Sequence, residues 1–224
     1  MFSKRVELAI VNRTFWPKNK IIGEALLQLA EFSANFHKVC IITQSEDNLY
    51  DDLLKENRGQ NIIVSSCNAR SDSTTHLVWR MVDAFIFMFW VLLTLMLKRP
   101  KRVYISTDPP IVVPFMVLIY AKLFGARYVY HLQDIHPEAA NIIIPLNRFF
   151  FKILRGIDSI VMRHADSIIT LTETMKQEII NRSGTKAPIY IVDNPAVISE
   201  KKGVIEINDS GSIKVDETTK SAKA

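Results

Sequence analysis

Two carboxylates that could take part in acid–base chemistry stand in one short segment. Asp134 and Glu138 follow the apolar run 127–132, which has the character of a buried strand. A carboxylate at the end of a strand can accept hydrogen bonds from substrate hydroxyl groups, and it can take the proton of an attacking hydroxyl. Asp134 is therefore the candidate catalytic residue, and Glu138 is a candidate for substrate binding. In the structural alternative, Asp134 caps the next segment and Glu138 makes a surface ion pair.

The same segment also contains His131 and His136, which raises the question of a metal site. The spacing of the two histidines and two carboxylates matches no familiar zinc pattern, so no metal is predicted. His131 is a candidate for substrate binding because it ends the apolar run, although it could equally be a core histidine with satisfied hydrogen bonds.

A second group of polar residues, Thr107 and Asp108, comes directly before two prolines and a helical pattern. The exposed N–H groups at a helix N-terminus favour anions, so Thr107 and Asp108 are candidates for substrate binding. The alternative is an ordinary helix cap in which the prolines set the turn.

The elements that would position these residues alternate regularly between strands and helices. Short apolar runs predict strands, and apolar residues spaced three and four apart predict helices. Continuous apolar strands joined by helical crossovers indicate a mostly parallel sheet covered on both faces, which is a doubly wound, Rossmann-like α/β domain. We predict strands at 6–11, 39–43, 61–65, 103–106, 127–132, 167–171 and 189–192, and helices at 21–36, 48–57, 75–97, 110–124, 146–164 and 172–182.

The domain is expected to cover residues 1–196, and the polar residues 197–224 to form a flexible tail or a small hairpin. In open parallel sheets, ligands bind at the carboxyl ends of the strands. The loops that should meet at that edge are 12–23, 106–110, 133–138 and 194–195.

Two apolar stretches next to basic residues suggest contact with a membrane. Residues 84–97 carry no charge, and their helical length of roughly 21 Å is short of the roughly 30 Å core of a bilayer. A membrane span is therefore not expected, and the helix is either a buried crossover or an interfacial helix on anionic lipid. Residues 142–154 repeat the pattern. The expected membrane contacts are Phe87, Trp90, Lys98, Arg99, Arg102 and Phe150.

Composition narrows the class of protein. Hydrophobic residues make up 48% of the 224 residues, which is enough for a folded core, and the net charge of +5 is too small to indicate nucleic acid. The 2 cysteines form no disulfide framework and favour a reducing compartment. The first apolar run is too short for a secretory signal, so we expect a cytoplasmic protein.

Five segments, found in order and at suitable spacing, carry a resemblance to a known family. They are residues 10–17, 105–110, 128–138, 165–172 and 191–195. Together they resemble the N-terminal, acceptor-side domain of family 4 retaining glycosyltransferases of the GT-B fold, which build bacterial O-antigen and capsule. The resemblance implies transfer of a sugar from a nucleotide sugar to a lipid-linked acceptor at the inner face of the cell membrane, with no cofactor.

The resemblance also implies that Asn12, Arg13 and Lys20 contact a lipid diphosphate, although they could equally be solvated surface residues. The family usually has more glycine in this first loop, so phosphate contact here would depend on Gly23. The motifs of the family's nucleotide-sugar domain are not found. We therefore expect either a truncated product or a split enzyme whose partner protein supplies the donor domain. A non-catalytic, membrane-associated Rossmann-like binding subunit and an unrelated small α/β enzyme are the alternatives.

Overall fold

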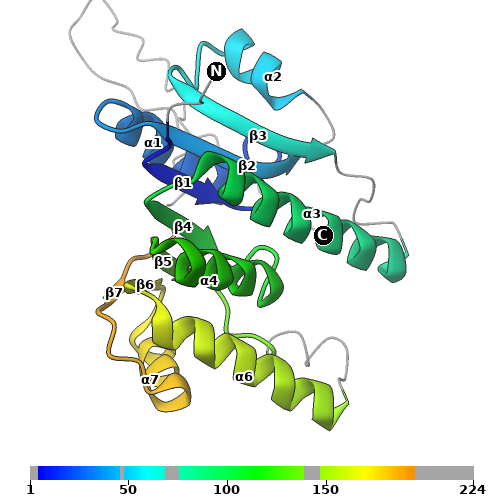
Figure 1. The fold of residues 1–224 in the computed structure, drawn as a ribbon, viewed down its shortest axis with the longest axis vertical. Coiled ribbons are helices and arrows are strands. Elements are labelled where there is room, and N and C mark those ends of the chain that lie inside the picture. Colours follow the sequence, from blue (N-terminus) through cyan, green and yellow to red (C-terminus); the bar gives the residue numbers. More distant parts are fainter. Residues whose placement is uncertain (1–4, 46–47, 69–75, 139–146, 195–224) are drawn as a thin grey trace, which may run out of the picture.

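A computed structural model describes residues 5–45, 48–68, 76–138 and 147–194 of the chain. These residues form a single sheet of seven strands in the order β3-β2-β1-β4-β5-β6-β7, and every neighbouring pair is parallel. Helices lie on both faces of this sheet (Figure 1). The predicted doubly wound, Rossmann-like α/β fold is therefore confirmed, while the predicted tail 197–224 lies outside the described residues.

All seven predicted strands are present, and their bounds differ from the predicted ones by three residues at most. They are β1 (Leu8–Val11), β2 (Val39–Ser45), β3 (Ile62–Asn68), β4 (Arg102–Ser106), β5 (Arg127–Leu132), β6 (Ser167–Thr170) and β7 (Ile189–Ile191). The predicted helices are also present, as α1 (Ile22–Ala34), α2 (Leu49–Lys55), α3 (Leu77–Lys98), α4 (Val112–Phe124), α6 (Arg148–His164) and α7 (Glu173–Ser183).

The two faces of the sheet bury separate apolar clusters. On one face, side chains of α3, α4, α6 and α7 pack on the sheet in the larger cluster, which includes Phe87, Val117, Met162 and Ile179. On the other face, α1 and α2 cover the half of the sheet formed by β1, β2 and β3. Burial on both sides explains the continuous apolar sequences of β1 and β2, whereas β5, outside that half, alternates between buried and more exposed residues.

Local sequence signals set the ends of several helices. Gly125 follows α4 in the left-handed conformation with φ 64°, which glycine adopts without steric cost. Thr172 caps α7, and its hydroxyl oxygen accepts a hydrogen bond from the N–H of Met175 at 3.1 Å, as its place in the sequence predicts.

Candidate functional site

The site is centred on β1 and β4, where the chain changes direction across the sheet. β1 is followed by its neighbour β2 on one side, whereas β4 lies on the other side of β1 and is followed by β5. This arrangement is a topological switch point, and the loops after the two strands meet at the carboxyl edge, where open parallel sheets bind ligands. The predicted site residues of loops 12–23 and 106–110 therefore share one edge with those of 131–138.

Asn12 lies buried at this switch point and connects the two loops. Its side-chain oxygen accepts a hydrogen bond from the Ser106 hydroxyl, and its amide group donates to the backbone carbonyl of Thr14. Asn12 thus fixes the first loop against the end of β4. Ser106, which sequence reasoning did not select, is its partner.

Asp108 completes the connection between the loops. One oxygen of its carboxylate accepts hydrogen bonds from the backbone N–H of Thr14 at 2.9 Å and from the Thr14 hydroxyl at 2.5 Å. The backbone N–H of Arg13 donates to the Asp108 carbonyl at 2.9 Å. Asp108 therefore shapes the first loop. The neighbouring Thr107 is buried, and its hydroxyl oxygen accepts a long hydrogen bond of 3.4 Å from the N–H of Gln133.

Arg13 is oriented by β2. Its Nε donates to the side-chain oxygen of Gln44 at 2.8 Å, and its backbone carbonyl accepts from the Thr43 hydroxyl at 2.9 Å. Gln44 was not predicted as a site residue, because nothing in the sequence connects it to a loop 31 positions earlier. These contacts hold the Arg13 guanidinium group at the carboxyl edge.

Gly23 and Lys20 take different places at the end of the first loop. Gly23 is buried in α1, and a Cβ atom added to it would stand 2.5 Å from the backbone nitrogen of Trp16. The close approach that requires glycine is therefore to the chain's own loop, and this packing accounts for Gly23 without a phosphate. Lys20 is exposed.

His131 pairs with Tyr104 across neighbouring strands. The Tyr104 hydroxyl lies 2.6 Å from Nδ1 of His131, and the two rings meet edge to face at 5.8 Å between centroids. Burial lowers the pKa of His131 to about 4, and burial raises the pKa of Tyr104, so both groups are neutral near pH 7. When Tyr104 donates to Nδ1, the proton of the neutral imidazole is on Nε2.

The Nε2 atom of His131 is buried and has no hydrogen-bond partner in the structure. Two more buried side-chain atoms lack a hydrogen-bond partner at the ends of β5 and β6. They are the side-chain nitrogen of Gln133 and the hydroxyl of Thr170. Buried polar atoms without partners carry a desolvation penalty that a bound ligand can relieve. Among the described residues, this part of the edge therefore contains buried polar atoms whose hydrogen bonds are unmet.

Asp134 is exposed in the loop after β5. None of the hydrogen bonds or ion pairs among the residues that the structure covers involves its carboxylate, so the group is available to a ligand. The edge therefore combines two groups. The neutral imidazole of His131 lies near the end of β5, and the available carboxylate of Asp134 lies in the loop after it.

The carboxylate of Glu138 forms ion pairs with other side chains of the chain. Its carboxylate lies 2.8 Å from Arg182 and 3.2 Å from Arg155, which agrees with the ion-pair alternative. Arg182 is 1% exposed, and it also contacts the carboxylate of Asp158 and the backbone carbonyl of His136. We call Arg182, Asp158 and Glu138 the Arg182 network; it fastens the loop that carries Asp134 to α6 and α7.

Asp158 is fully buried at the centre of the Arg182 network. The Tyr130 hydroxyl donates to its carboxylate at 2.9 Å. Burial raises the pKa of Asp158 to about 6, and the charge of Arg182 acts in the opposite direction. Sequence reasoning missed Asp158 and Arg182, since they lie on two helices and no local pattern marks them as partners.

A metal site was not predicted from the sequence. Within residues 5–45, 48–68, 76–138 and 147–194, no group of three or more His, Cys, Asp or Glu side chains is close enough to hold a metal ion.

The predicted membrane contacts divide between the core and the surface. Phe87 is completely buried in the core cluster, so its prediction as a membrane contact is wrong; it lies on the side of α3 that faces the sheet. Trp90 is half-buried, and its indole N–H donates to the Ser65 carbonyl at 3.5 Å. Arg99, Arg102 and Phe150 are exposed, and Lys98 is partly so.

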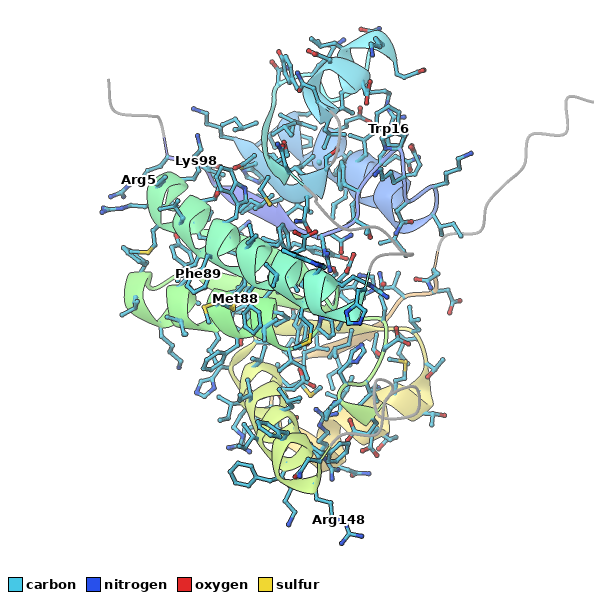
Figure 2. The ribbon with its side chains drawn as sticks, turned by 90° about the vertical axis from the view of Figure 1, so that its right-hand side faces the viewer. Arg5, Trp16, Met88, Phe89, Lys98 and Arg148 are labelled. Carbon is cyan, nitrogen blue, oxygen red and sulfur yellow. The ribbon has the colours of Figure 1, made fainter. Side chains whose placement is uncertain are left out.

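The outer side of α3 remains apolar over most of its length. Of the helices that the structure describes, α3 is the one long and apolar enough to cross a membrane by length and composition. Phe89 and Met88, which are both labelled in Figure 2, differ in burial: Phe89 is exposed and Met88 is buried. The exposed apolar residues of this helix, which we call the α3 stripe, are Trp79, Met81, Val82, Phe85, Ile86, Phe89, Leu93, Met96 and Leu97.

Comparison with known proteins identifies the kind of domain. A family model described as a glycosyl transferase 4-like domain matches residues 22–195. A search of curated protein sequences finds no match. Among solved structures, Arabidopsis thaliana UGT89C1 complexed with UDP-L-rhamnose is similar, with 12% identity and a TM-score of 0.52, over 93% of this chain and 53% of that one.

Sucrose-phosphate synthase from Thermosynechococcus elongatus is also similar, with 10% identity and a TM-score of 0.53, over 84% of this chain and 48% of that one. At these identities the likeness concerns the fold. The chain spans about half the length of the structures that it matches.

Proposed function

The chain belongs to the glycosyl transferase 4-like domain family, and we propose that its carboxyl-edge loops form the acceptor side of a sugar-transfer site. The complete protein would transfer a sugar from a nucleotide sugar to a lipid-linked acceptor, in the assembly of O-antigen, capsule or exopolysaccharide. The observation that carries the proposal is the position of Asp134, which is exposed in the loop after β5, next to the switch point, at the edge where open parallel sheets generally bind ligands.

The proposed reaction assigns roles to Asp134, in the loop after β5, and to His131, near the end of β5. Asp134 orients the acceptor hydroxyl and takes its proton as the hydroxyl oxygen bonds to the anomeric carbon of the donor sugar. The bond from that carbon to the nucleotide diphosphate breaks, and the diphosphate leaves with the bonding electrons. The Nε2–H of His131 donates a hydrogen bond to an oxygen of the bound sugar, which relieves its buried, unpartnered state. Family resemblance suggests retention of the anomeric configuration, which in a single step requires the hydroxyl to attack on the face from which the diphosphate leaves.

A second domain would hold most of the nucleotide sugar, either in the same polypeptide or in a partner protein. Two observations support this part of the proposal. The chain covers 53% of a structure that is complexed with UDP-L-rhamnose, and it covers 48% of sucrose-phosphate synthase. Arg13, held at the switch point by Gln44, would meet a phosphate of one of the substrates there.

A lipid-linked acceptor would be reached from the inner face of the cell membrane. The α3 stripe supports this, because an exposed apolar helix face of this length marks an interaction surface. A transmembrane span is disfavoured by the other side of α3, where Phe87, Val91 and Leu95 are completely buried against the sheet. The helix would instead lie in the interface, with Lys98 and Arg99 near anionic head groups.

A transfer assay tests the proposal. The full chain is supplied with a lipid-linked sugar acceptor and a panel of nucleotide sugars, both alone and together with a GT-B donor domain encoded by the same or a neighbouring gene. Sugar transfer that depends on Asp134 supports the assignment. A fully assembled pair that binds the acceptor but transfers no sugar from any donor would instead favour the non-catalytic membrane-associated binding subunit.

A further inference from the structure

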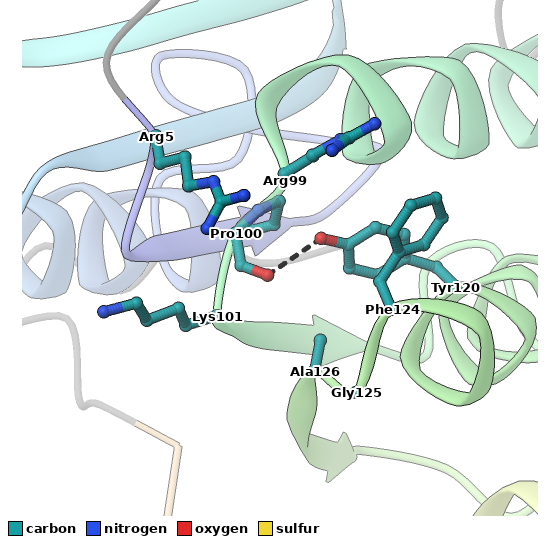
Figure 3. Close-up of a pocket in the computed structure, with 8 residues that line it drawn as sticks. All are labelled: Arg5, Arg99, Pro100, Lys101, Tyr120, Phe124, Gly125 and Ala126. Carbon is teal, nitrogen blue, oxygen red and sulfur yellow. Dashed lines mark hydrogen bonds between the residues drawn. The ribbon is translucent and has the colours of Figure 1, made fainter.

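A basic cavity lies at the opposite edge of the sheet, at the amino ends of β4 and β5. It has a volume of about 160 Å³, several times the ~30 Å³ share of one water molecule. Its walls come from the residues before β1 and from the ends of α3 and α4 (Figure 3). The residues that matter for its chemistry are Arg5, Arg99, Lys101, Tyr120 and Phe124.

All the charged residues that line this cavity are positively charged. Three of its residues are cationic, and no carboxylate lines it. No ion pair among the described parts of the chain involves Arg5, Arg99 or Lys101. Uncompensated cations around a concave surface attract an anion, and guanidinium groups suit phosphate oxygens in particular.

The Tyr120 hydroxyl adds a polar group to the wall. It donates to the Pro100 carbonyl at 2.8 Å, so its oxygen remains able to accept a further hydrogen bond (Figure 3). Burial raises the pKa of Tyr120 to about 12, and the charges of Arg99 and Arg5 both act to lower it. Both guanidinium charges are therefore near enough to interact with the Tyr120 hydroxyl.

Arg99 takes this position at a conformational cost. It follows α3 with φ 49°, in the left-handed region that normally favours glycine, and its N–H bonds to the Leu95 carbonyl at 2.8 Å. Its guanidinium carbon lies 5.5 Å from the centre of the Phe124 ring. Stabilisation of helix C-termini by cations would account for Arg99 alone. Arg5 and Lys101 precede strands, so the stabilisation of a helix C-terminus does not explain their positions at the cavity.

We propose that this cavity binds a phosphate group, presented either by the head group of an anionic lipid or by a free phosphate. Both sources are compatible with the surroundings. Phe124 in the lining is partly exposed, and Leu97 and Leu123, which are close in sequence to Arg99 and Phe124, are exposed apolar residues that suit a lipid, whereas the cations alone suit a free anion. The site is separate from the acceptor site, which lies at the carboxyl edge, so the proposal holds whether or not the chain takes part in sugar transfer.

The test compares Arg99→Gly and Lys101→Gln with the control Lys186→Gln, which removes one exposed cation elsewhere. Glycine suits the conformation at position 99, so Arg99→Gly removes the guanidinium group and keeps the fold. In one arm, inorganic phosphate is titrated into the full chain at constant ionic strength. In the other, the chain binds phosphatidylcholine vesicles with or without phosphatidic acid. Each cavity variant should weaken binding roughly tenfold, and the control should not.

Each outcome decides between the alternatives. A preference for phosphatidic acid vesicles that both cavity variants reduce supports the site and assigns it to a lipid head group. Binding of inorganic phosphate that both variants reduce, without a preference for these vesicles, supports the site and assigns it to a soluble phosphate. The proposal is overturned if the wild-type chain shows neither effect, or if both cavity variants bind as the control does.

Discussion

The guanidinium group of Arg182 lies 2.5 Å from the carboxylate of Asp158, and both side chains are almost completely withdrawn from solvent. Removal of one partner would leave the other as an uncompensated buried charge, which typically costs about 3–5 kcal/mol. We therefore predict that Arg182→Leu lowers the free energy of unfolding by about that amount, as measured by urea denaturation.

Arg155→Leu is the matched control, because Arg155 contacts the same Glu138 from the surface. An exposed pair of this kind contributes at most about 1 kcal/mol, so the control should have a small effect. If Arg182→Leu proves no more costly than Arg155→Leu, the Arg182 network does not hold the fold together.

Asp134→Asn should abolish most sugar transfer while leaving the fold intact. The asparagine can still form hydrogen bonds but cannot take a proton, and loss of a general base typically costs about 10²-fold or more in rate. Because Asp134 is exposed, the unfolding curve of the Asp134→Asn variant should match that of the wild-type chain. Glu56→Gln, which changes another exposed carboxylate at the end of α2, serves as the control for charge. Undiminished transfer by Asp134→Asn would refute the catalytic assignment.

His131 should make the stability of the chain depend on pH. Its folded pKa of about 4 lies below the ordinary value of 6.5, since burial disfavours the charged form. Between these values the unfolded chain binds the proton more readily, so the free energy of unfolding falls as the pH falls through this window. The contribution, fully present above about pH 6.5, is at most about 3 kcal/mol.

The measurement compares urea denaturation of the wild-type chain and His131→Gln at about pH 7 and about pH 4.5. The raised pKa of Asp158 gives a dependence of the opposite sign, but this is common to both proteins and cancels in the difference. Equal pH dependence in the two proteins would show that His131 titrates normally.

Substitution by alanine should have opposite effects on the free energy of unfolding at two helical glycines. Gly23→Ala places a methyl group 2.5 Å from the Trp16 nitrogen, so the loop must shift, and we expect a loss of about 1–3 kcal/mol in the free energy of unfolding. Gly156→Ala in α6 meets nothing within 4 Å, and it should stabilise the helix by about 0.5–1 kcal/mol. Thermal denaturation of both variants tests this pair of predictions. Similar changes in melting temperature would contradict the close packing of Gly23 against the first loop.

The proposed membrane contact can be tested with two exposed phenylalanines. Phe89 in the α3 stripe is 64% exposed, and Phe32 in α1 is 66% exposed on a different side of the molecule. Phe89→Glu should reduce flotation with vesicles that contain anionic lipid roughly tenfold, because it places a charge in the apolar contact. Phe32→Glu should leave flotation unchanged. Equal effects of the two changes would exclude α3 as the contact surface.

The fold could be predicted from the sequence because each of its signals is local. The apolar run of β5 gave the bounds of that strand at both ends, and Thr172 marked the start of α7. The alternation of strands and helices then determined a parallel sheet. The order of strands, with β4 beside β1, explains why polar residues from distant loops share one edge.

The parts of the site that depend on tertiary contacts could not be predicted in this way. Arg182 and Asp158 are 24 positions apart, and only the packing of α6 on α7 brings them together. Phe87 was assigned to the wrong side of α3 because apolar residues surround the whole helix, so its sequence does not distinguish the buried side from the exposed one. Gly23 was linked to a phosphate, whereas the contact that requires it is with Trp16.

The direction of α3 has a consequence for the way in which substrate arrives. The helix leaves the carboxyl end of β3 and returns the chain to the amino end of β4, so it runs against the strands and along the sheet. If the α3 stripe rests on a bilayer, the strands lie roughly in the membrane plane, and the edge with Asp134 opens sideways. A lipid-linked acceptor would then reach that edge by two-dimensional diffusion within the leaflet, without leaving it.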